Sequence, residues 1–129
     1  MTPRTALSIA GSDPSGGAGI QADLKTFAAL GVHGMAALAG LTVQNTQGVR
    51  AASPIDPGFV VAQVEAVLDD IEVHATKLGM LTNAGIAGAV GLMGVEKRRR
   101  ESWDSAAAGA SGWNTVSVTI LSMMSCTTP

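Results

Sequence analysis

The sequence has a single cysteine, Cys126, and no long apolar run. One cysteine forms no internal disulfide, and without a second cysteine it builds no zinc cluster. No apolar run reaches the roughly 18 to 20 residues that a membrane-spanning helix requires. The amino-terminal segment also lacks the apolar core and small-residue cleavage site of a signal peptide. These absences predict a cytoplasmic protein that does not span a membrane.

A strong excess of charge of either sign is also missing. The 129 residues include 14% charged side chains and carry a formal net charge of −2. This balance gives no basic footprint for binding to nucleic acid. The length allows one domain of ordinary size and hardly two. We therefore expect a single domain, or part of one, with no nucleic-acid partner.

The composition changes near residue 95. Residues 1–94 hold 14 of the 16 glycines and both phenylalanines, as in an ordinary globular domain. Residues 95–129 hold both tryptophans, the cysteine and a basic run at 97–100. Acidic residues flank this run, which is typical of a solvated helix end. Residues 115–121 alternate polar and apolar side chains and predict a strand on an exposed sheet edge.

Predicted strands and helices alternate along residues 1–94. Ala6–Ala10 and Met35–Val43 are apolar stretches that predict buried strands, and Ala75–Leu81 predicts a third. Apolar residues at helical spacing predict a helix over Ile20–Leu30, with Gly31 as its carboxyl-terminal cap.

Two further helices are predicted from their first residues. Asp56 before Pro57 combines an N-cap with a proline at the first helical position. Thr82 is the expected N-cap of the last helix. This order of elements predicts an α/β fold with a mainly parallel sheet and helices on its faces. Ligands then bind at the carboxyl ends of the strands, where three segments lie: 11–19, 44–48 and 79–80.

The loop at 11–19 has glycine spacings that occur in two phosphate-binding motifs. Gly17–Ala22 matches the G-x-G-x-x-A dinucleotide fingerprint between a strand and a helix. That fingerprint also requires an acidic residue about 20 positions later, and residues 36–45 contain none, which disfavours NAD and FAD. A P-loop is excluded because Lys and Ser or Thr do not follow Gly16. What remains is a loop whose backbone approaches a ligand closely.

Asp23 and Gln44 are polar residues near the predicted ligand-binding end. An Asp in the first turn of a helix is stabilised by the helix dipole by about 0.3 to 1 kcal/mol, so Asp23 has a structural explanation. Gln44 offers an uncharged amide that donates and accepts hydrogen bonds, which suits a neutral heterocycle. A satisfied loop amide explains Gln44 equally well.

Four other side chains carry weaker signals. His33 and His74 flank strands as isolated residues, which is typical of surface or capping histidines rather than catalytic ones. Lys77 lies inside the third predicted strand, where it is either an edge contact or faces a ligand phosphate. Met80 has the character of a core residue, although methionine also suits a pocket wall beside a flat ring.

Four segments together give the chain a specific resemblance to a known family: Ala6–Gly19, Ile20–Thr26, Leu41–Val49 and Lys77–Leu81. Over about residues 5–90 the chain resembles the hydroxymethylpyrimidine/phosphomethylpyrimidine kinases of thiamine biosynthesis, which have a ribokinase-like three-layer α/β fold. Pyridoxal kinase-like proteins share that fold and are the nearest alternative. The resemblance implies phosphorylation of 4-amino-5-hydroxymethyl-2-methylpyrimidine and of its monophosphate, with ATP and Mg²⁺.

The same resemblance implies a set of substrate-binding residues around the aminopyrimidine: Gly11, Ala18, Asp23, Gln44 and Met80. Gln44 would pair with the polar edge of the ring, and Asp23 would face the ligand. In such a kinase the protein aligns the substrate hydroxyl with the γ-phosphoryl group and neutralises developing charge.

The later part of the chain departs from the family pattern. The family's ATP site, its anion hole and its catalytic cysteine lie in the second half of a longer chain, and their motifs do not occur here. Cys126 has no flanking glycines and no following helix, so no catalytic residue and no metal ligand is assigned. The tail over 95–129 is interpreted as a shifted reading frame or a wrongly predicted gene end, with a genuine lineage-specific ending as the alternative.

These observations leave three hypotheses for the chain. It is a hydroxymethylpyrimidine kinase by descent, a non-catalytic pyrimidine-binding remnant, or the product of a damaged gene. Activity of the chain alone is not expected, because the nucleotide site is missing. We also predict marginal folding or homo-oligomerisation, since a short sheet leaves an edge uncovered.

Overall fold

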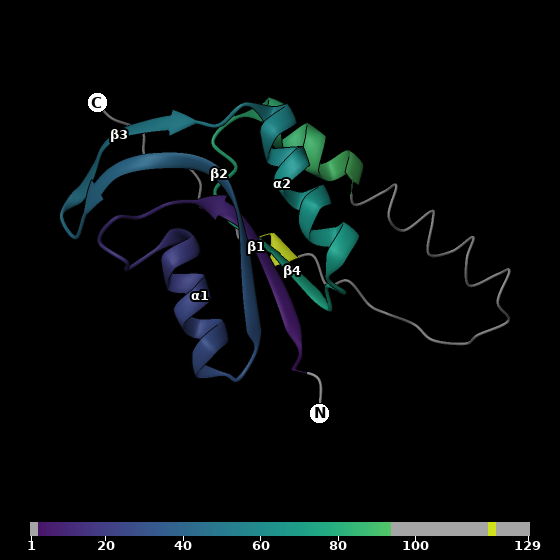
Figure 1. Ribbon diagram of the computed structural model, residues 1–129. Helices are drawn as coiled ribbons and strands as arrows, with labels where there is room; N and C mark the ends of the chain where they lie inside the picture. The colour runs from purple at the N-terminus through teal and green to yellow at the C-terminus, as the bar shows by residue number, and fades with distance from the viewer. Residues whose placement is uncertain (1–2, 94–118, 121–129) are drawn as a thin grey trace, which may run out of the picture.

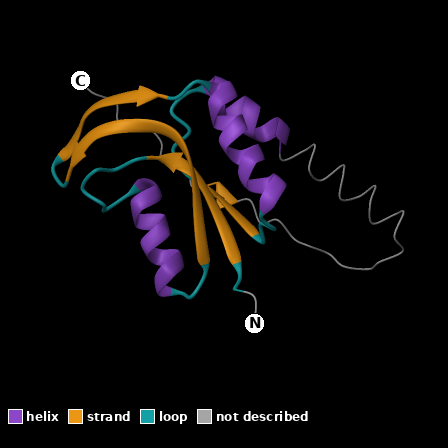
Figure 2. Ribbon diagram, viewed as in Figure 1, coloured by secondary structure: helices purple, strands orange, loops and turns teal. Residues whose placement is uncertain are grey.

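The computed structural model describes residues 3–93 and 119–120. Within this part of the chain, one sheet has the strand order β3-β2-β1-β4-β5 (Figure 1). Helix α1 covers one face of the sheet, and α2 with a helical segment over 84–93 covers the other (Figure 2). The elements are β1 Thr5–Gly11, α1 Gly19–Ala29, β2 His33–Asn45, β3 Gly48–Pro54, α2 Pro57–Asp70, β4 Ala75–Leu78 and β5 Thr119–Ile120.

The parallel core of the sheet confirms the α/β class expected from the sequence. β1 pairs in parallel with β2 on one side and with β4 on the other. The chain therefore leaves β1 for one neighbour and later returns to its opposite side. In α/β sheets ligands bind outside the carboxyl ends of the strands at such a reversal of strand order.

Strand β3 was not predicted from the sequence. Residues 44–48 were expected to form a polar segment that ends the second strand. Instead, β2 continues to Asn45, and the chain then turns back into β3, which pairs with β2 antiparallel. The Asn45 side chain closes the turn, because its Oδ1 accepts a hydrogen bond from the Gln47 amide at 2.9 Å. β3 is exposed along its whole length, so it has none of the apolar alternation that marks a half-buried strand.

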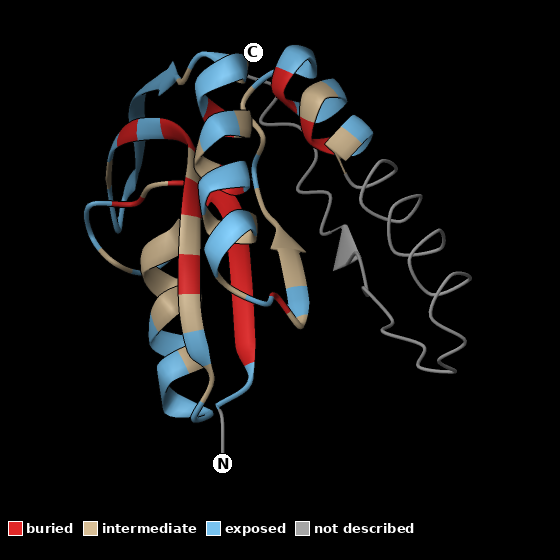
Figure 3. Ribbon diagram, turned by 45° about the vertical axis from the view of Figure 1, so that its right-hand side comes forward, coloured by how far each residue is buried: buried red, intermediate tan, exposed pale blue. Residues whose placement is uncertain are grey.

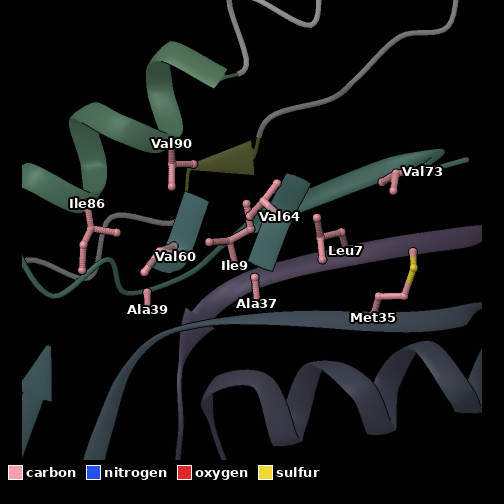
Figure 4. Close-up of a cluster of buried hydrophobic side chains, with 10 residues drawn as sticks. All are labelled: Leu7, Ile9, Met35, Ala37, Ala39, Val60, Val64, Val73, Ile86 and Val90. Carbon is pink, nitrogen blue, oxygen red and sulfur yellow. The ribbon is translucent and has the colours of Figure 1, made fainter. Parts of the chain in front are cut away.

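The hydrophobic core lies between the sheet and the two helical segments on that face, α2 and residues 84–93 (Figure 4). Side chains at alternate positions of β1 and β2 point to this face, as the pleat of a strand requires. Figure 3 shows the buried residues in red along β1 and at intervals along β2, at the centre of the sheet. The cluster consists of Leu7, Ile9, Met35, Ala37, Ala39, Val60, Val64, Val73, Ile86 and Val90.

The ends of α1 and α2 follow the sequence predictions. Gly31, after the end of α1, has a φ of +69°, a conformation that glycine adopts without strain. Asp56 caps α2 by accepting a hydrogen bond from the Phe59 amide at 3.1 Å, with Pro57 at the first turn. Among the described helices, none is long and apolar enough to cross a membrane.

The prediction that Thr82 caps the last helix is wrong. Asn83 takes this role, since its Oδ1 accepts a hydrogen bond from the Ile86 amide at 2.9 Å. The Thr82 hydroxyl instead donates to the Ala39 carbonyl at 3.0 Å, which ties the segment after β4 to β2. β4 also ends at Leu78, earlier than predicted.

Most of the predicted tail, residues 95–129, lies outside the described residues, including the basic run at 97–100. The exception is β5, where Thr119 and Ile120 pair in parallel with Lys77 and Leu78 at the sheet edge. This pairing agrees, for two residues, with the edge strand expected over 115–121.

Gly40 gives a test of the packing between β2 and the segment after β4. An added Cβ would overlap the Thr82 side chain and lie 3.3 Å from the Ser53 carbonyl oxygen. Overpacking of this kind typically costs about 1 to 3 kcal/mol, so we predict that Gly40→Ala lowers the free energy of unfolding by that amount in urea denaturation. Gly88→Ala is the control, because nothing lies within 4 Å of a Cβ there. Equal effects of the two substitutions would contradict the tight fit at Gly40.

Candidate functional site

The carboxyl ends of β1 and β4 bring Gly11 and Met80 together. Gly11 is buried, and a Cβ at this position would lie 3.0 Å from Met80 Cε and 3.6 Å from the Gly40 carbonyl oxygen. The Met80 side chain is 54% exposed, so it is not the core residue that its composition favoured. It forms a flexible apolar wall over the end of β1.

The glycine loop after β1 is organised by the Asp13 carboxylate. Asp13 is only 2% exposed. Its Oδ1 accepts hydrogen bonds from the Ser15 amide at 2.9 Å and the Ser15 hydroxyl at 2.7 Å. Its Oδ2 accepts from the amides of Gly17 at 3.1 Å and Ala18 at 2.8 Å. The position of Ala18 is therefore fixed by this carboxylate.

Hydrogen bonding also sets the electrostatics of the loop. The Ser15 hydroxyl bond is the main reason that the pKa of Asp13 lies below its ordinary value, and the backbone amides of the loop act in the same direction. Burial opposes this shift, because it disfavours the charged form. Asp13 had no predicted role, although Asp before Pro and Ser is a turn signal that could have indicated one.

Helix α1 begins directly against the end of β1. Gly19 has a φ of +57°, and an added Cβ would overlap the Gly11 carbonyl oxygen. Glycine is therefore required here both for its backbone conformation and for close approach. The close approach of Gly19 to Gly11 places Ala18, the residue before α1, beside the end of β1.

Gln44 is linked to the glycine loop through Ser12 and Thr42. The Ser12 amide donates to the Gly40 carbonyl at 2.9 Å, and the Thr42 amide donates to Ser12 Oγ at 3.1 Å. The Thr42 hydroxyl donates to the Ser12 carbonyl at 2.9 Å and lies 3.2 Å from Gln44 Oε1. No hydrogen bond links the Gln44 amide nitrogen to an acceptor among the described residues.

Asp23 is an ion-pair residue rather than a helix-dipole residue. Because α1 begins at Gly19, Asp23 lies in the second turn, and the expectation of a first-turn position is wrong. Asp23 Oδ2 accepts hydrogen bonds from Ser8 Oγ at 2.6 Å and Lys77 Nζ at 2.7 Å. This pair also gives Lys77 a partner that the sequence analysis left open.

The two histidines lie away from these residues. His74 is bound to Thr5 at the start of β1, where its Nδ1 lies 2.8 Å from the Thr5 hydroxyl and accepts from the Thr5 amide at 3.3 Å. His33 is exposed at the start of β2. Both are at the amino ends of parallel strands, opposite the candidate site.

The glycine loop does not have the free backbone amides of a P-loop. The loop amides that would cradle a phosphate in a P-loop already bind Asp13. The nearby cation Lys25 donates to the Gly16 carbonyl at 2.9 Å. Across residues 3–93, no group of three or more His, Cys, Asp or Glu side chains is placed to hold a metal. The site instead offers an amide, a carboxylate oxygen and an apolar wall, which suit a neutral heterocycle.

Known proteins match the chain over this region. The family profile described as phosphomethylpyrimidine kinase matches residues 13–102. A hydroxymethylpyrimidine/phosphomethylpyrimidine kinase of Escherichia coli (strain K12) is 54% identical over 85 residues, which are 66% of this chain and 32% of that relative. The chain thus spans about a third of the length of the curated relatives it matches.

Two solved structures resemble the fold. The crystal structure of phosphomethylpyrimidine kinase from Clostridium difficile 630 has a TM-score of 0.65 and 47% identity, covering 67% of this chain and 38% of that one. An ADP complex of Bacillus subtilis pyridoxal kinase has a TM-score of 0.68 and 42% identity, covering 75% of this chain and 38% of that one. These neighbours confirm the ribokinase-like fold class expected from the sequence.

The Asp13 carboxylate predicts a pH-dependent stability. Its folded pKa is depressed, so its contribution is present above the ordinary carboxyl pKa and is lost as the pH falls through the folded pKa. We predict that Asp13→Asn lowers the urea midpoint at pH 7 and that the difference from wild type shrinks as the pH falls below the ordinary carboxyl pKa of 3.8. Asp69→Asn, an exposed position on α2, is the control. A constant difference across this pH range would contradict the role of the charge.

Proposed function

This chain belongs to the phosphomethylpyrimidine kinase family, and from this premise we propose that its described part is the substrate-binding side of such an enzyme. The reaction proposed for the whole enzyme is the phosphorylation of 4-amino-5-hydroxymethyl-2-methylpyrimidine and of its monophosphate by ATP in thiamine biosynthesis. The 54% identity to the Escherichia coli kinase supports this assignment.

The observation that carries the proposal is the convergence of the expected substrate residues on one end of the sheet. Gly11 and Met80 are in contact range, and Ala18 is fixed by the loop that follows Gly11. Gln44 is linked to the same loop through Ser12 and Thr42. Gly11, Gln44 and Met80 are distant in sequence, and the parallel pairing of β1 with β2 and β4 brings their strands together.

Each group matches one feature of an aminopyrimidine. The amide of Gln44 donates and accepts, which suits a ring edge with an amino group and a ring nitrogen. Met80 supplies a polarisable apolar wall for the flat ring. Asp23 accepts hydrogen bonds, so it complements an amino or hydroxyl donor. The function of these residues is to bind and orient the hydroxymethyl group, because positioning supplies much of the rate in phosphoryl transfer.

ATP and Mg²⁺ belong to the proposal for the whole enzyme and not to the described residues. The glycine loop lies on the substrate side, since its amides are engaged by Asp13. No catalytic residue is assigned within residues 3–93. We therefore favour a chain that binds pyrimidine without turning it over, and its cytoplasmic location stays a prediction.

Binding of pyridoxal is the second candidate function. The Bacillus subtilis pyridoxal kinase has a TM-score of 0.68 to this chain, which is similar to the value of 0.65 for the phosphomethylpyrimidine kinase. The higher sequence identity, 47% against 42%, favours the pyrimidine. The two ligands are distinguished by titrating both against the same protein.

Self-association is proposed from the apolar surface of the β2–β3 ribbon. Leu41, Val43 and Val49 are each more than half exposed. Leu41 pairs with Ser53 and Val43 with Ala51, so Leu41 and Val43 share a face with Ser53 and Ala51, whereas a register shift after Val43 pairs Val49 with Gln44. An exposed apolar patch of this kind marks an interaction surface.

We predict that the wild-type chain binds the hydroxymethyl aminopyrimidine in a calorimetric titration and that Gln44→Ala weakens this binding by at least about tenfold. The substitution removes the only side-chain amide assigned to the ring edge. Gln47→Ala is the matched control, because Gln47 is exposed in the adjacent turn.

The same titration can also contradict the proposed pyrimidine site. Equal affinities of Gln44→Ala and wild type would place the pyrimidine elsewhere, and tighter binding of pyridoxal would favour the second candidate. Phosphorylated product in the presence of ATP and Mg²⁺ would show that a nucleotide site exists outside the described residues.

For the ribbon, we predict that wild type sediments at micromolar concentration with a mass above the 13.0 kDa of one chain. Replacing Leu41 and Val43 by threonine keeps residues that favour strands and removes the apolar side chains of this face, so it shifts the protein toward monomer. A wild-type monomer with one cooperative thermal transition would contradict this prediction.

A further inference from the structure

Ser8, Asp23 and Lys77 form a polar cluster between α1 and the sheet. Ser8 Oγ donates to Asp23 Oδ2 at 2.6 Å, and Lys77 Nζ donates to the same oxygen at 2.7 Å. The three residues come from β1, α1 and β4. Tertiary structure assembles this cluster, because Lys77 follows Asp23 by 54 positions in the chain.

The members of the cluster differ in their exposure. Ser8 is fully buried, whereas the Asp23 and Lys77 side chains are 18% and 34% exposed. A buried hydroxyl requires a hydrogen-bond partner, and a partly buried carboxylate requires a cation or donors. The cluster meets both requirements and has an outer side that solvent or a ligand reaches.

Both donors bind the same oxygen of Asp23. Within residues 3–93, no donor binds Oδ1, so this oxygen keeps its lone pairs for another group. Rotation of the carboxylate would break two charge-assisted hydrogen bonds together. Ser8 and Lys77 therefore hold the carboxylate in one orientation and leave one oxygen available.

Gly79 connects the cluster to the substrate site. A Cβ at Gly79 would lie 3.0 Å from Lys77 Nζ and 2.6 Å from the Ala10 Cβ. The absence of a side chain at Gly79 therefore makes room for the ammonium group. Because Gly79 precedes Met80, the ammonium lies beside the strand end that holds the proposed substrate residues.

We infer that Lys77, together with Ser8, is a positioning residue that fixes the Asp23 carboxylate for hydrogen bonding to a donor group of the substrate. This inference rests on the proposed function, because an aminopyrimidine with a hydroxymethyl group supplies amino and hydroxyl donors. Lys77 acts through Asp23 and does not touch the substrate. Lys77 therefore orients Asp23 through the ion pair, which differs from both functions expected from the sequence, an edge contact and a direct contact with a ligand phosphate.

A double-mutant cycle on the full chain tests this coupling. Calorimetric titration with the hydroxymethyl aminopyrimidine compares wild type, Lys77→Met, Asp23→Asn and the double variant. We expect Lys77→Met to weaken binding by about tenfold in wild type and to have little further effect in Asp23→Asn. Lys77→Arg keeps the cation and is expected to recover part of the affinity.

Arg4→Met is the charge-matched control for the cycle. Arg4 is exposed and precedes β1 at the amino end of the sheet, so its loss should leave the affinity unchanged. An equal loss of affinity from Lys77→Met in the wild-type protein and in Asp23→Asn would overturn the inference, because it would place Lys77 in direct contact with the ligand. If Lys77→Met weakened binding of the monophosphate but not of the hydroxymethyl aminopyrimidine, that result would also overturn the inference, because it would indicate a direct contact with the phosphate.

A measurement without ligand separates this inference from the proposed function. Nitrogen-15 NMR of the lysine side chains should show a protected Lys77 ammonium resonance in wild type that is lost in Asp23→Asn. A Lys77 resonance unchanged by Asp23→Asn overturns the inference whether or not pyrimidine binds. A wild-type chain that keeps the protected resonance and binds no pyrimidine contradicts the proposed function alone and supports the orientation of Asp23.

Discussion

Parallel pairing of β1 on both of its sides is the constraint on which the candidate site depends. β2 and β4 flank β1 and run in its direction, so their carboxyl ends reach the same edge of the sheet. Burial of Leu7 and Ile9 under α2 stabilises this arrangement, with about 1.5 to 3 kcal/mol for each fully buried side chain of this size. The contact of Gly11 with Met80 follows from the pairing and needs no local sequence signal.

The Asp13 carboxylate adds a second constraint at the end of β1. It accepts hydrogen bonds from the loop that follows it, so the protein's own side chain holds the loop in one conformation. Preorganisation of this kind reduces the entropic cost of binding. The same bonds withdraw the amides of Gly17 and Ala18 from phosphate binding. The loop is therefore suited to hold a neutral ring beside Gly11 rather than to cradle a nucleotide.

Local signals in the sequence predicted the parallel strands and the helix ends at Gly31 and Asp56, because periodicity and capping act over a few residues. They did not predict β3, whose exposed residues have no apolar alternation. The resemblance to the kinase family placed Asp23 at the ligand, but its ion pair with Lys77 had no signal in the sequence. Contacts between residues far apart in the chain depend on the sheet register, which periodicity alone does not give.

The proposed function depends on the binding of an aminopyrimidine at the carboxyl ends of β1, β2 and β4. Chemical-shift mapping by NMR, with the hydroxymethyl aminopyrimidine added to the nitrogen-15-labelled chain, tests this claim most directly. We expect the largest amide shifts at Gly11, Ala18, Gln44 and Met80. Shifts confined to the amino ends of these strands, near Thr5, or no shifts in a folded chain, would contradict it.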